Sequence, residues 1–502
     1  MRLVFALAIT LSPAAAIAGG VFVPGYGSQA QPRAGAFLAK ADDPSALFHN
    51  PAGLAKMTGT VIHIGFNLVD FSQTFQRAGN YEDPAFSGPY PEAKDESTPA
   101  IGIGEFQGIP LVAVSTDLGL DLPIRFGAGL IAAHGYPERL YAEDYVFEDP
   151  NEPPPPGRYD VLEQDVFVAF PSIAVAYSPI EKLDVGARLS YGFAGLKGKT
   201  AVWGVRNYDE EIASDGIFDV DVSDNWVPTF GIGVLYRPTD RIEIGANYRS
   251  AANIGAKGEG TAQIGSGLGL AGMPETIEPE NVFPLCEAGG TAEALKACVD
   301  LSLPQVAGIG GRFIFRNAAG KEIGDVELDV QWENWSSAGD IEVIVDGKSG
   351  LTGLPLNPTR IRHEFDDTFS IRLGGSYGFP VGKNTLSVRA GAAYDTAAAP
   401  EEFTRLDLDG LARTTLGLGV GFEMSRVRIE VGGGAVLEGE RTVSTNCNPD
   451  VATPTCAGFG RQDLPSPAQP LQGQNNQVLS PFNDGTYDQS YLLLSLGVTT
   501  WF

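Results

Sequence analysis

The chain has 502 residues, and its 34 Lys and Arg residues against 62 Asp and Glu residues give a formal net charge of −28. This length predicts two or three ordinary domains, unless one large barrel uses all of it. Nucleic acid is a poor partner for so acidic a chain, because phosphate binding depends on basic patches. The acidity fits either a solvated surface or acidic loops that face an external medium.

The first residues have the pattern of a secretory signal. Met1-Arg2 precedes an apolar run from Leu3 to Leu11, and Ala16-Ile17-Ala18 is an A-x-A cleavage site. We therefore expect residues 1–18 to be a signal peptide. No later apolar run approaches the ~18 residues that a membrane helix requires.

Residues 19–57 precede the strand-like part of the chain, and we call them the hatch. The stretch ADDPSALFHNPAGL within them predicts one short helical turn, which Asp43 caps and which ends at Asn50, because a proline follows. A periplasmic tail is the alternative interpretation of this segment. Its apolar content and its helix cap favour a folded element instead.

Residues 58–502 read almost entirely as β-strands. In 182–191, 241–249 and 325–333, apolar residues alternate strictly with polar ones, so that each strand has one apolar and one polar face. The same pattern recurs in 369–377, 386–394, 427–435 and 491–502. Such strands fit a soluble sandwich or a membrane barrel that turns its apolar face to lipid.

The connections between these strands favour the barrel. Short turns alternate with long loops, which is typical of outer-membrane barrels and has no reason in a sandwich. The short connections are 178–181, 237–240, 317–321, 380–384 and 424–425; the long ones are 76–107, 137–163, 200–225, 257–301, 337–363, 396–412 and 438–489. The pattern predicts an all-β, transmembrane antiparallel barrel of about 14 strands with long extracellular loops.

Aromatic residues stand near the strand ends that lead into the short turns. They are Tyr177, Tyr236, Phe315, Tyr377, Phe422 and the terminal Phe502. We interpret them as an interfacial aromatic girdle, although aromatic residues also favour strands in general. A terminal phenylalanine further predicts recognition by the barrel assembly machinery of a Gram-negative outer membrane.

The polar strand faces predict a mostly polar lumen. The charged residues on them are Arg188, Arg249, Arg372, Arg389 and Arg428, against Glu243, Glu327, Asp329, Glu333 and Glu430. These groups either form a network between plug and wall, or include an arginine that receives a substrate carboxylate through its fork of N–H donors. The sequence does not select that arginine.

The four cysteines form two local pairs, Cys286 with Cys298 and Cys447 with Cys456. In an exported chain, pairs this close indicate loop disulfides. A zinc site is the alternative, but no histidine lies near either pair.

The hatch resembles the N-terminal segment of the FadL/TodX-type outer-membrane transporters of long-chain fatty acids and hydrocarbons. The resemblance rests on GGVFVPGYGSQAQPRAGAFLAKADDPSALFHNPAGLAKMTG, with its signature Asn50, Pro51 and Ala52, and on FPSIAVAYSPIEKLDVGARLSYGF, VLYRPTDRIEIGANYRS, DVQWENWSS, DDTFSIRLGGSYGF and VRAGAAYDTAAAP. It implies a 14-stranded barrel whose lumen the hatch plugs. It also implies uptake of a hydrophobic substrate from an extracellular groove to an internal pocket, with lateral exit beside a kinked third strand.

The resemblance also directs attention to particular residues. Glycines in the third strand, near 122–134, are candidates for the exit kink, though this chain has 63 glycines and barrel strands tolerate them. The candidates are Gly127 and Gly129 for the kink, and Phe22, Phe37, Phe48, Arg249, Arg372 and Arg389 for the substrate pocket.

No catalytic, cofactor or metal pattern emerges from the remaining sequence. The histidines His49, His63, His134 and His363 lack ligand spacing, and no nucleophile–base pair can be assigned. We expect a monomeric transporter that contacts outer-membrane lipid and lipopolysaccharide and needs no cofactor. The alternatives are a porin for small solutes and a barrel-type lipid hydrolase.

Overall fold

The computed structural model describes residues 23–81, 86–132, 138–142, 145, 153–202, 212–265, 276–280, 286, 289–351, 353, 355–356, 358–408, 410–443 and 484–502. The expected signal peptide and Phe22 lie outside these residues, as do Cys447 and Cys456. No helix in the described part of the chain is long and apolar enough to cross a membrane.

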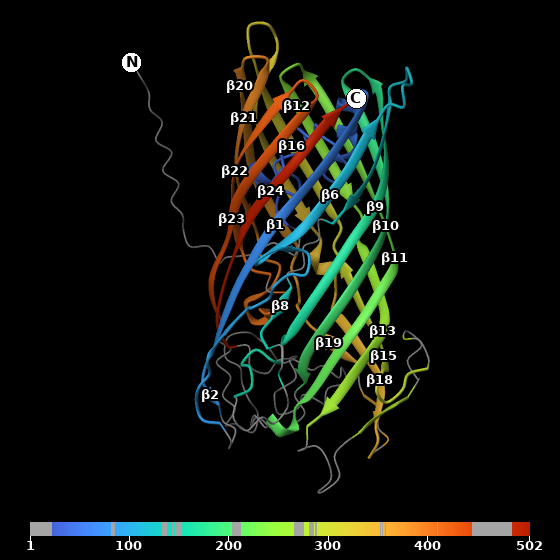
Figure 1. Cartoon of the computed structure of the whole chain (residues 1–502), viewed down its shortest axis with the longest axis vertical. Helices are drawn as coiled ribbons and strands as arrows, with labels where there is room; N and C mark the ends of the chain where they lie inside the picture. Colours follow the sequence, from blue (N-terminus) through green and yellow to red (C-terminus); the bar gives the residue numbers. More distant parts are fainter. Residues whose placement is uncertain are drawn as a thin grey trace.

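Strands dominate the molecule and form a closed antiparallel barrel of 14 crossings (Figure 1), so the predicted fold is confirmed. The long strands are β1 (Thr60–Arg77), β6 (Phe106–Thr116), β7 (Ile124–Ile131), β9 (Glu163–Ile180), β10 (Leu183–Val202), β11 (Gly216–Thr239), β12 (Ile242–Arg249), β13 (Ala252–Ile264), β15 (Leu295–Leu303), β16 (Val306–Arg316), β17 (Glu322–Glu333), β18 (Ile341–Ser349), β20 (Thr368–Val381), β21 (Asn384–Asp395), β22 (Arg413–Met424), β23 (Val427–Val443) and β24 (Gly485–Trp501). Short strands are β2 (Asn80–Tyr81), β3 (Gly88–Pro89), β4 (Glu92–Lys94), β5 (Gly102–Ile103), β8 (Arg139–Leu140), β14 (Ile277–Pro279) and β19 (Thr359–Ile361).

Helical turns are few and short. They are η1 (Gln31–Arg33), α1 (Ala46–His49) and η2 (Pro51–Lys56) in the hatch, and η3 (Ile212–Ser214), η5 (Trp335–Ser337) and η6 (Glu401–Phe403) in the loops. The helix predicted in the hatch is therefore present as α1, although its N-cap residue is Ser45 rather than the expected Asp43, whose carboxylate accepts the Ser45 N–H at 2.8 Å. It ends at Asn50, which has an extended backbone (φ −161°, ψ 101°), as the following proline requires.

The first and last strands close the barrel. β1 pairs with β24 from Val61↔Trp501 to Arg77↔Gly485, and it pairs on its other edge with β6. Closure removes the free strand edges, whose backbone groups lipid cannot satisfy. The short turns β9–β10, β11–β12, β16–β17, β20–β21 and β22–β23 lie at one end of the barrel, with the C-terminus, and the long loops lie at the other (Figure 1).

The strand faces are oriented as the alternation predicts. Leu189 and Tyr191 of β10 point outward, and Leu189 is 64% exposed, whereas Arg188 before them and Ser190 between them are buried. The girdle residues Tyr177, Tyr236, Phe315, Tyr377 and Phe502 are likewise exposed, and Phe422 is half-buried. The apolar surface is therefore on the outside, which rules out a soluble sandwich.

In the described part of the third crossing, the pairing with β9 changes register between Ile131 and Arg139. β7 pairs with β9 as far as Ile131↔Phe170, and β8 resumes the pairing at Arg139↔Gln164. Between these two pairs, the third crossing uses eight residues and β9 uses six, so the register shifts by two residues. The ladder on the other side, between β6 and β7, also ends at Ile131, where it pairs with Leu111.

This placement corrects the position expected for the kink. Gly127 and Gly129 lie in a part of β7 that pairs with both neighbours without a register shift. A Cβ on Gly127 would lie 2.7 Å from Leu54 Cδ1, so this glycine makes room for the hatch rather than bending the strand.

The outward orientation of β10 can be tested by replacing Leu189 with arginine. We expect Leu189→Arg to lower the unfolding free energy in liposomes by about 2–4 kcal/mol if the residue is near the bilayer midplane, because lipid cannot solvate the charge. Urea titration of the refolded protein measures this. The exposed turn residue Glu181 provides the control, since Glu181→Arg should change little; equal effects would contradict the assigned membrane face.

Candidate functional site

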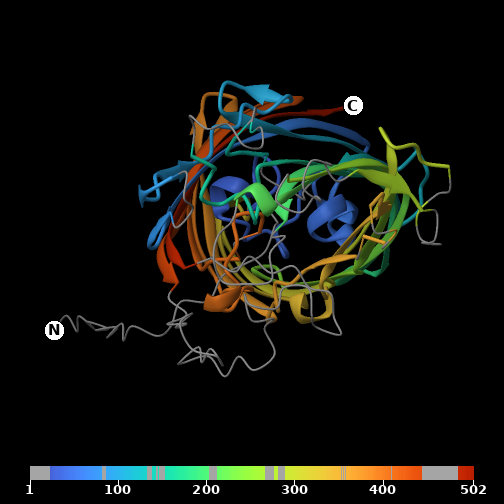
Figure 2. The ribbon, with the colours of Figure 1, turned by 90° about the horizontal axis from the view of Figure 1, so that it is seen from below.

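The hatch lies inside the barrel, where its turns are enclosed by the ring of strands (Figure 2). Nearly every residue from Val23 to Leu54 is buried, and Tyr26, Arg33 and Asn50 are fully inaccessible. A lumen of 14 strands is wider than its own side chains can fill, so this segment supplies the missing interior.

The signature residues Asn50, Pro51 and Ala52 attach the hatch to the wall. The Asn50 side-chain N–H donates to the carbonyl oxygen of Leu38 at 2.8 Å and to that of Val234 in β11 at 3.1 Å. Its Oδ1 accepts the Ala52 N–H at 3.2 Å and so caps η2. One short amide side chain therefore joins two parts of the hatch to a barrel strand.

Glycines in the wall allow this close contact. A Cβ on Gly233 would lie 2.0 Å from Asn50 Oδ1, and a Cβ on Gly186 would lie 2.3 Å from the Ala52 nitrogen. The same holds where η1 touches the opposite wall, at Gly374, Gly391, Gly417, Gly419 and Gly432. The sequence alone does not single out these inward-facing glycines, although their alternation with outward-facing apolar residues places them on the lumen side of the strands.

Wall carboxylates bind the backbone of the hatch. Asp329 Oδ2 accepts the N–H groups of Phe37 and Leu38 at 2.8 and 3.0 Å, and Glu327 Oε1 accepts that of Ala39 at 2.6 Å. Because these amides belong to no regular element, the carboxylates satisfy groups that would otherwise be buried without partners.

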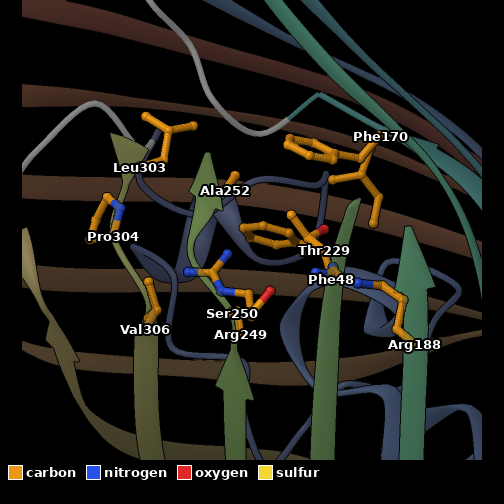
Figure 3. A pocket seen from close by; sticks show the side chains of 11 residues that line it. Phe48, Phe170, Arg188, Thr229, Arg249, Ser250, Ala252, Leu303, Pro304 and Val306 are labelled. Atoms are coloured by element: carbon orange, nitrogen blue, oxygen red, sulfur yellow. The ribbon is translucent and has the colours of Figure 1, made fainter. Parts of the chain in front are cut away.

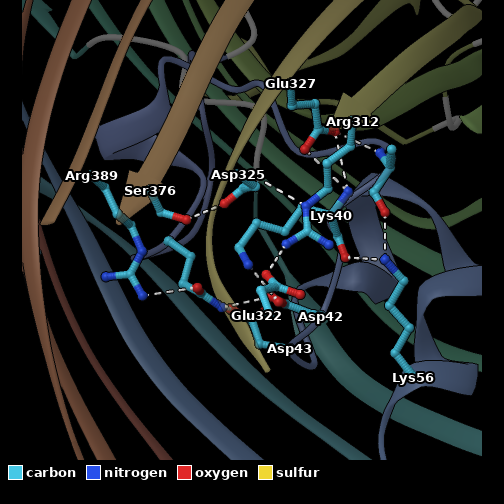
Figure 4. A network of polar contacts seen from close by, with 12 residues as sticks. Lys40, Asp42, Asp43, Lys56, Arg312, Glu322, Asp325, Glu327, Ser376 and Arg389 are labelled. Atoms are coloured by element: carbon cyan, nitrogen blue, oxygen red, sulfur yellow. Dashed lines mark hydrogen bonds and ion pairs between the residues drawn. The ribbon is translucent and has the colours of Figure 1, made fainter. Parts of the chain in front are cut away.

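Ion pairs complete the attachment (Figure 4). Arg33 Nη2 of the hatch lies 2.8 Å from Asp325 and 2.9 Å from Glu327, and Lys56 Nζ lies 2.8 Å from Glu243. Removing one member would leave a buried charge uncompensated, which is strongly destabilising. Some of the predicted charged lumen residues, Glu243 and Glu327 among them, thus form a network between hatch and wall, to which the hatch contributes Arg33 and Lys56.

Two predicted pocket arginines are paired elsewhere in the lumen, Arg389 within this network and Arg372 within the wall. Arg389 lies 2.8 Å from Glu430 and donates to Gln29 of the hatch at 3.0 Å, and Arg372 lies 3.4 Å from Asp395. Phe37 also packs within the hatch, with its ring centroid 5.3 Å from that of His49.

The two other predicted residues, Arg249 and Phe48, line a small cavity beside the hatch, which we call the inner cavity (Figure 3). Its volume is about 20 Å³, and its lining is Phe48, Ile131, Phe170, Arg188, Thr229, Arg249, Ser250, Ala252, Leu303, Pro304 and Val306. The Arg249 guanidinium lies 4.2 Å from the Phe48 ring centroid. Arg188 donates to Leu47 O at 3.2 Å, and its Nε has no hydrogen-bond partner among the described residues.

A larger cavity of about 140 Å³, the outer cavity, lies toward the long loops. Its wall is mainly apolar and includes Val166, Leu196, Val220, Val299, Leu301 and Val343. The expectation of a mostly polar lumen therefore holds around the hatch and is wrong for this part of the barrel. On β15, Leu301 lines the outer cavity and Leu303 lines the inner one, so an apolar surface continues from one to the other.

Polar groups from three long loops, which precede β9, β20 and β22, meet beside the outer cavity. Arg405 lies 3.2 Å from Asp160 and 3.0 Å from Asp407, and His363 lies 3.4 Å from Asp407. Burial alone would raise the pKa of the Asp407 carboxyl, but Arg405 and His363 outweigh it and hold that pKa well below its usual range. The loops are thus joined by an ionised cluster.

Two further expectations concern cysteines and metals. Cys286 and Cys298 form a disulfide with a Cα–Cα distance of 5.3 Å, which attaches a loop to β15. Asp43, His63 and Glu430 approach one another in the lumen, but Glu430 already lies 2.8 Å from Arg389 and 3.0 Å from Arg428. These cations disfavour a metal ion, and we assign none there.

Comparison with known proteins identifies the family. Residues 9–455 match the model of the outer membrane protein transport proteins (OMPP1/FadL/TodX). The chain belongs to this family. It is accordingly an outer-membrane transport protein rather than an enzyme, and the hydrolase alternative is dropped.

Several relatives share its sequence or fold. The outer membrane protein NMB0088 of Neisseria meningitidis serogroup B is 25% identical over 392 residues, which cover 75% of this chain and 78% of that protein. A FadL homologue of Pseudomonas aeruginosa superimposes with a TM-score of 0.69 at 17% identity, over 96% of this chain and 100% of that one. The toluene transporter TodX of P. putida gives 0.60 at 16% identity, over 95% and 99%.

The contact between signature and wall can be tested at Gly233. We expect Gly233→Ala to raise the ionic conductance of the barrel in planar bilayers, because the added methyl group displaces Asn50 from Val234 and loosens the hatch. Gly255→Ala is the matched control, since a Cβ there meets no atom within 4 Å. Equal conductance of the two variants would contradict the role given to this contact.

Proposed function

We propose that this protein takes up long-chain fatty acids or related hydrophobic carboxylates across the outer membrane, by passive passage and without chemistry on the substrate. The observation that carries the proposal is an apolar wall that ends at the paired arginines Arg188 and Arg249. A molecule with a long apolar tail and one anionic end matches both parts.

The apolar part of the path favours a hydrocarbon chain. Side chains such as Val299 and Leu301 offer no hydrogen bonds, so a polar solute gains nothing there, whereas each buried CH₂ group contributes about 0.8 kcal/mol. The hatch occupies the lumen beside this wall, which argues against the porin alternative.

The arginines favour an acid over a neutral compound. Guanidinium groups bind carboxylates through paired, charge-assisted hydrogen bonds, and a hydrocarbon cannot replace such bonds. Phe48 and Phe170 flank the arginines and would hold the first carbons of the tail. Because the inner cavity has room for little more than one water molecule, substrate entry requires Phe48 or its neighbours to move.

We propose that the substrate leaves sideways at the third crossing, where the pairing of its described residues with β9 changes register. Ile131 and Phe170 form the last pair of the β7–β9 ladder, and both line the inner cavity. The binding site is therefore adjacent to the place where the wall loses its regular pairing. Exit there leads to the hydrocarbon of the membrane, in which a fatty acid is soluble.

The arginine pair can be tested with matched ligands. We expect Arg188→Gln and Arg249→Gln to weaken oleate binding about 10- to 100-fold each, since a charge-assisted hydrogen bond contributes about 1.5–3 kcal/mol. Binding of oleyl alcohol should change little. Equilibrium binding to the purified protein measures both, with Arg316→Gln at the end of β16, outside both cavities, as the control.

Two outcomes would contradict this assignment. Equal loss of oleate and oleyl alcohol binding would mean that the arginines only hold the fold. Uptake of labelled toluene, with no uptake of oleate, would favour neutral aromatic compounds, such as the one named for the related toluene transporter.

We further propose that the assembly machinery recognises the C-terminal Phe502, whose side chain is 70% exposed, and that the monomer lies among lipids and lipopolysaccharide. We expect deletion of Phe502 to reduce the heat-modifiable, folded fraction in outer-membrane preparations. Phe379→Ala removes an exposed aromatic residue near the same end and serves as the control. An unchanged folded fraction would refute the recognition role.

A further inference from the structure

Tyr26 of the hatch takes part in the hydrogen bonding of the barrel wall. Its side chain is fully buried, and its hydroxyl accepts the N–H of Ala132 at 3.1 Å and donates to the carbonyl oxygen of Pro110. Pro110 belongs to β6, and Ala132 directly follows β7. One phenol therefore bridges two neighbouring crossings.

The bridge lies where the backbone ladder stops. β6 and β7 pair from Thr116↔Phe126 to Leu111↔Ile131, and the next pair in this register would be Pro110 and Ala132. Proline has no N–H, so it cannot donate across this position. The Tyr26 hydroxyl takes the place of the backbone partner, and we call the Pro110–Ala132 position the seam.

The same tyrosine contacts the inner cavity through Phe48. The two rings meet edge to face with centroids 5.4 Å apart, and His49 Nε2 lies 2.6 Å from the Tyr26 carbonyl oxygen. Phe48 lines the inner cavity beside Arg249. A ligand that displaces Phe48 therefore acts directly on the residue that closes the seam.

We propose that Tyr26 is a latch on the barrel wall, which opens the seam between Pro110 and Ala132 when substrate in the inner cavity displaces Phe48. The proposal rests on the proposed function and adds the residue that couples binding to release. In the closed state, the hydroxyl satisfies Pro110 O and Ala132 N, which would otherwise be unpaired within the membrane. Once it withdraws, the ladder between the two strands ends at Leu111 and Ile131.

Tyr26→Phe tests the latch most directly. Phenylalanine keeps the ring against Phe48 but loses both hydrogen bonds to the seam. We expect initial oleate uptake by cells to rise severalfold, while oleate affinity of the purified protein stays within twofold of the wild type. Tyr248→Phe is the control, because that hydroxyl donates to Gln305 on the wall, away from the seam.

A disulfide engineered across the seam should have the opposite effect on uptake, because it keeps the seam closed. In Pro110→Cys/Ala132→Cys, we expect oxidation to stop oleate uptake without lowering oleate binding, and reduction to restore uptake. Val112→Cys/Leu130→Cys joins two residues that already pair in the same ladder, so its disulfide should leave uptake unchanged. Heat modifiability verifies that each variant is assembled.

The outcomes separate the latch from the proposed function. The latch would be overturned if the oxidised Pro110→Cys/Ala132→Cys variant took up oleate at the wild-type rate. It would also be overturned if uptake by Tyr26→Phe were unchanged or slower, even if the arginine pair binds oleate. Failure of Arg188→Gln and Arg249→Gln to weaken oleate binding would instead overturn the proposed function.

Discussion

Hydrocarbon offers no hydrogen-bond partners, and this constraint determines most of the molecule. The wall must pair every backbone group, so β1 closes onto β24 and the sheet has no free edge between them. Apolar side chains such as Leu189 occupy the outer face, which leaves the charged side chains to the lumen. A lumen of this width then needs partners for those charges, and the hatch supplies them.

The wall holds the hatch mainly through its backbone. Asp329 and Glu327 accept main-chain N–H groups, and Asn50 donates to the main-chain carbonyls of Leu38 and Val234. Contacts at this distance are possible only because strand residues such as Gly233 and Gly391 have no side chain. The glycines at these positions of the wall are thus explained by the segment that packs against them.

The lumen has two environments, and their arrangement suits an amphipathic passenger. Around the hatch, charges are paired and hydrogen-bonded, whereas the wall of the outer cavity is apolar. The inner cavity lies at their boundary, so an anionic head would meet Arg188 and Arg249 while the tail remains against apolar side chains. The same boundary is adjacent to the end of the β7 ladder, so the proposed binding site and the proposed exit lie beside one another.

Much of the architecture follows from the sequence alone, because strand alternation and loop lengths are local properties. They predicted the 14-stranded barrel, the buried faces of Arg188 and Glu327, and the end of α1 at Asn50. Which arginine faces a cavity was decided only by tertiary structure: Arg389 and Arg249 share the same alternation, but Glu430 pairs with the first, and Phe48 of the hatch stacks on the second. The role proposed for Tyr26 was equally hidden, since it depends on how the hatch meets β6 and β7, two strands far from Tyr26 in the sequence, beyond their last pair, Leu111 and Ile131. Local patterns assign a residue to a face, whereas its partner across the lumen depends on how the whole chain closes.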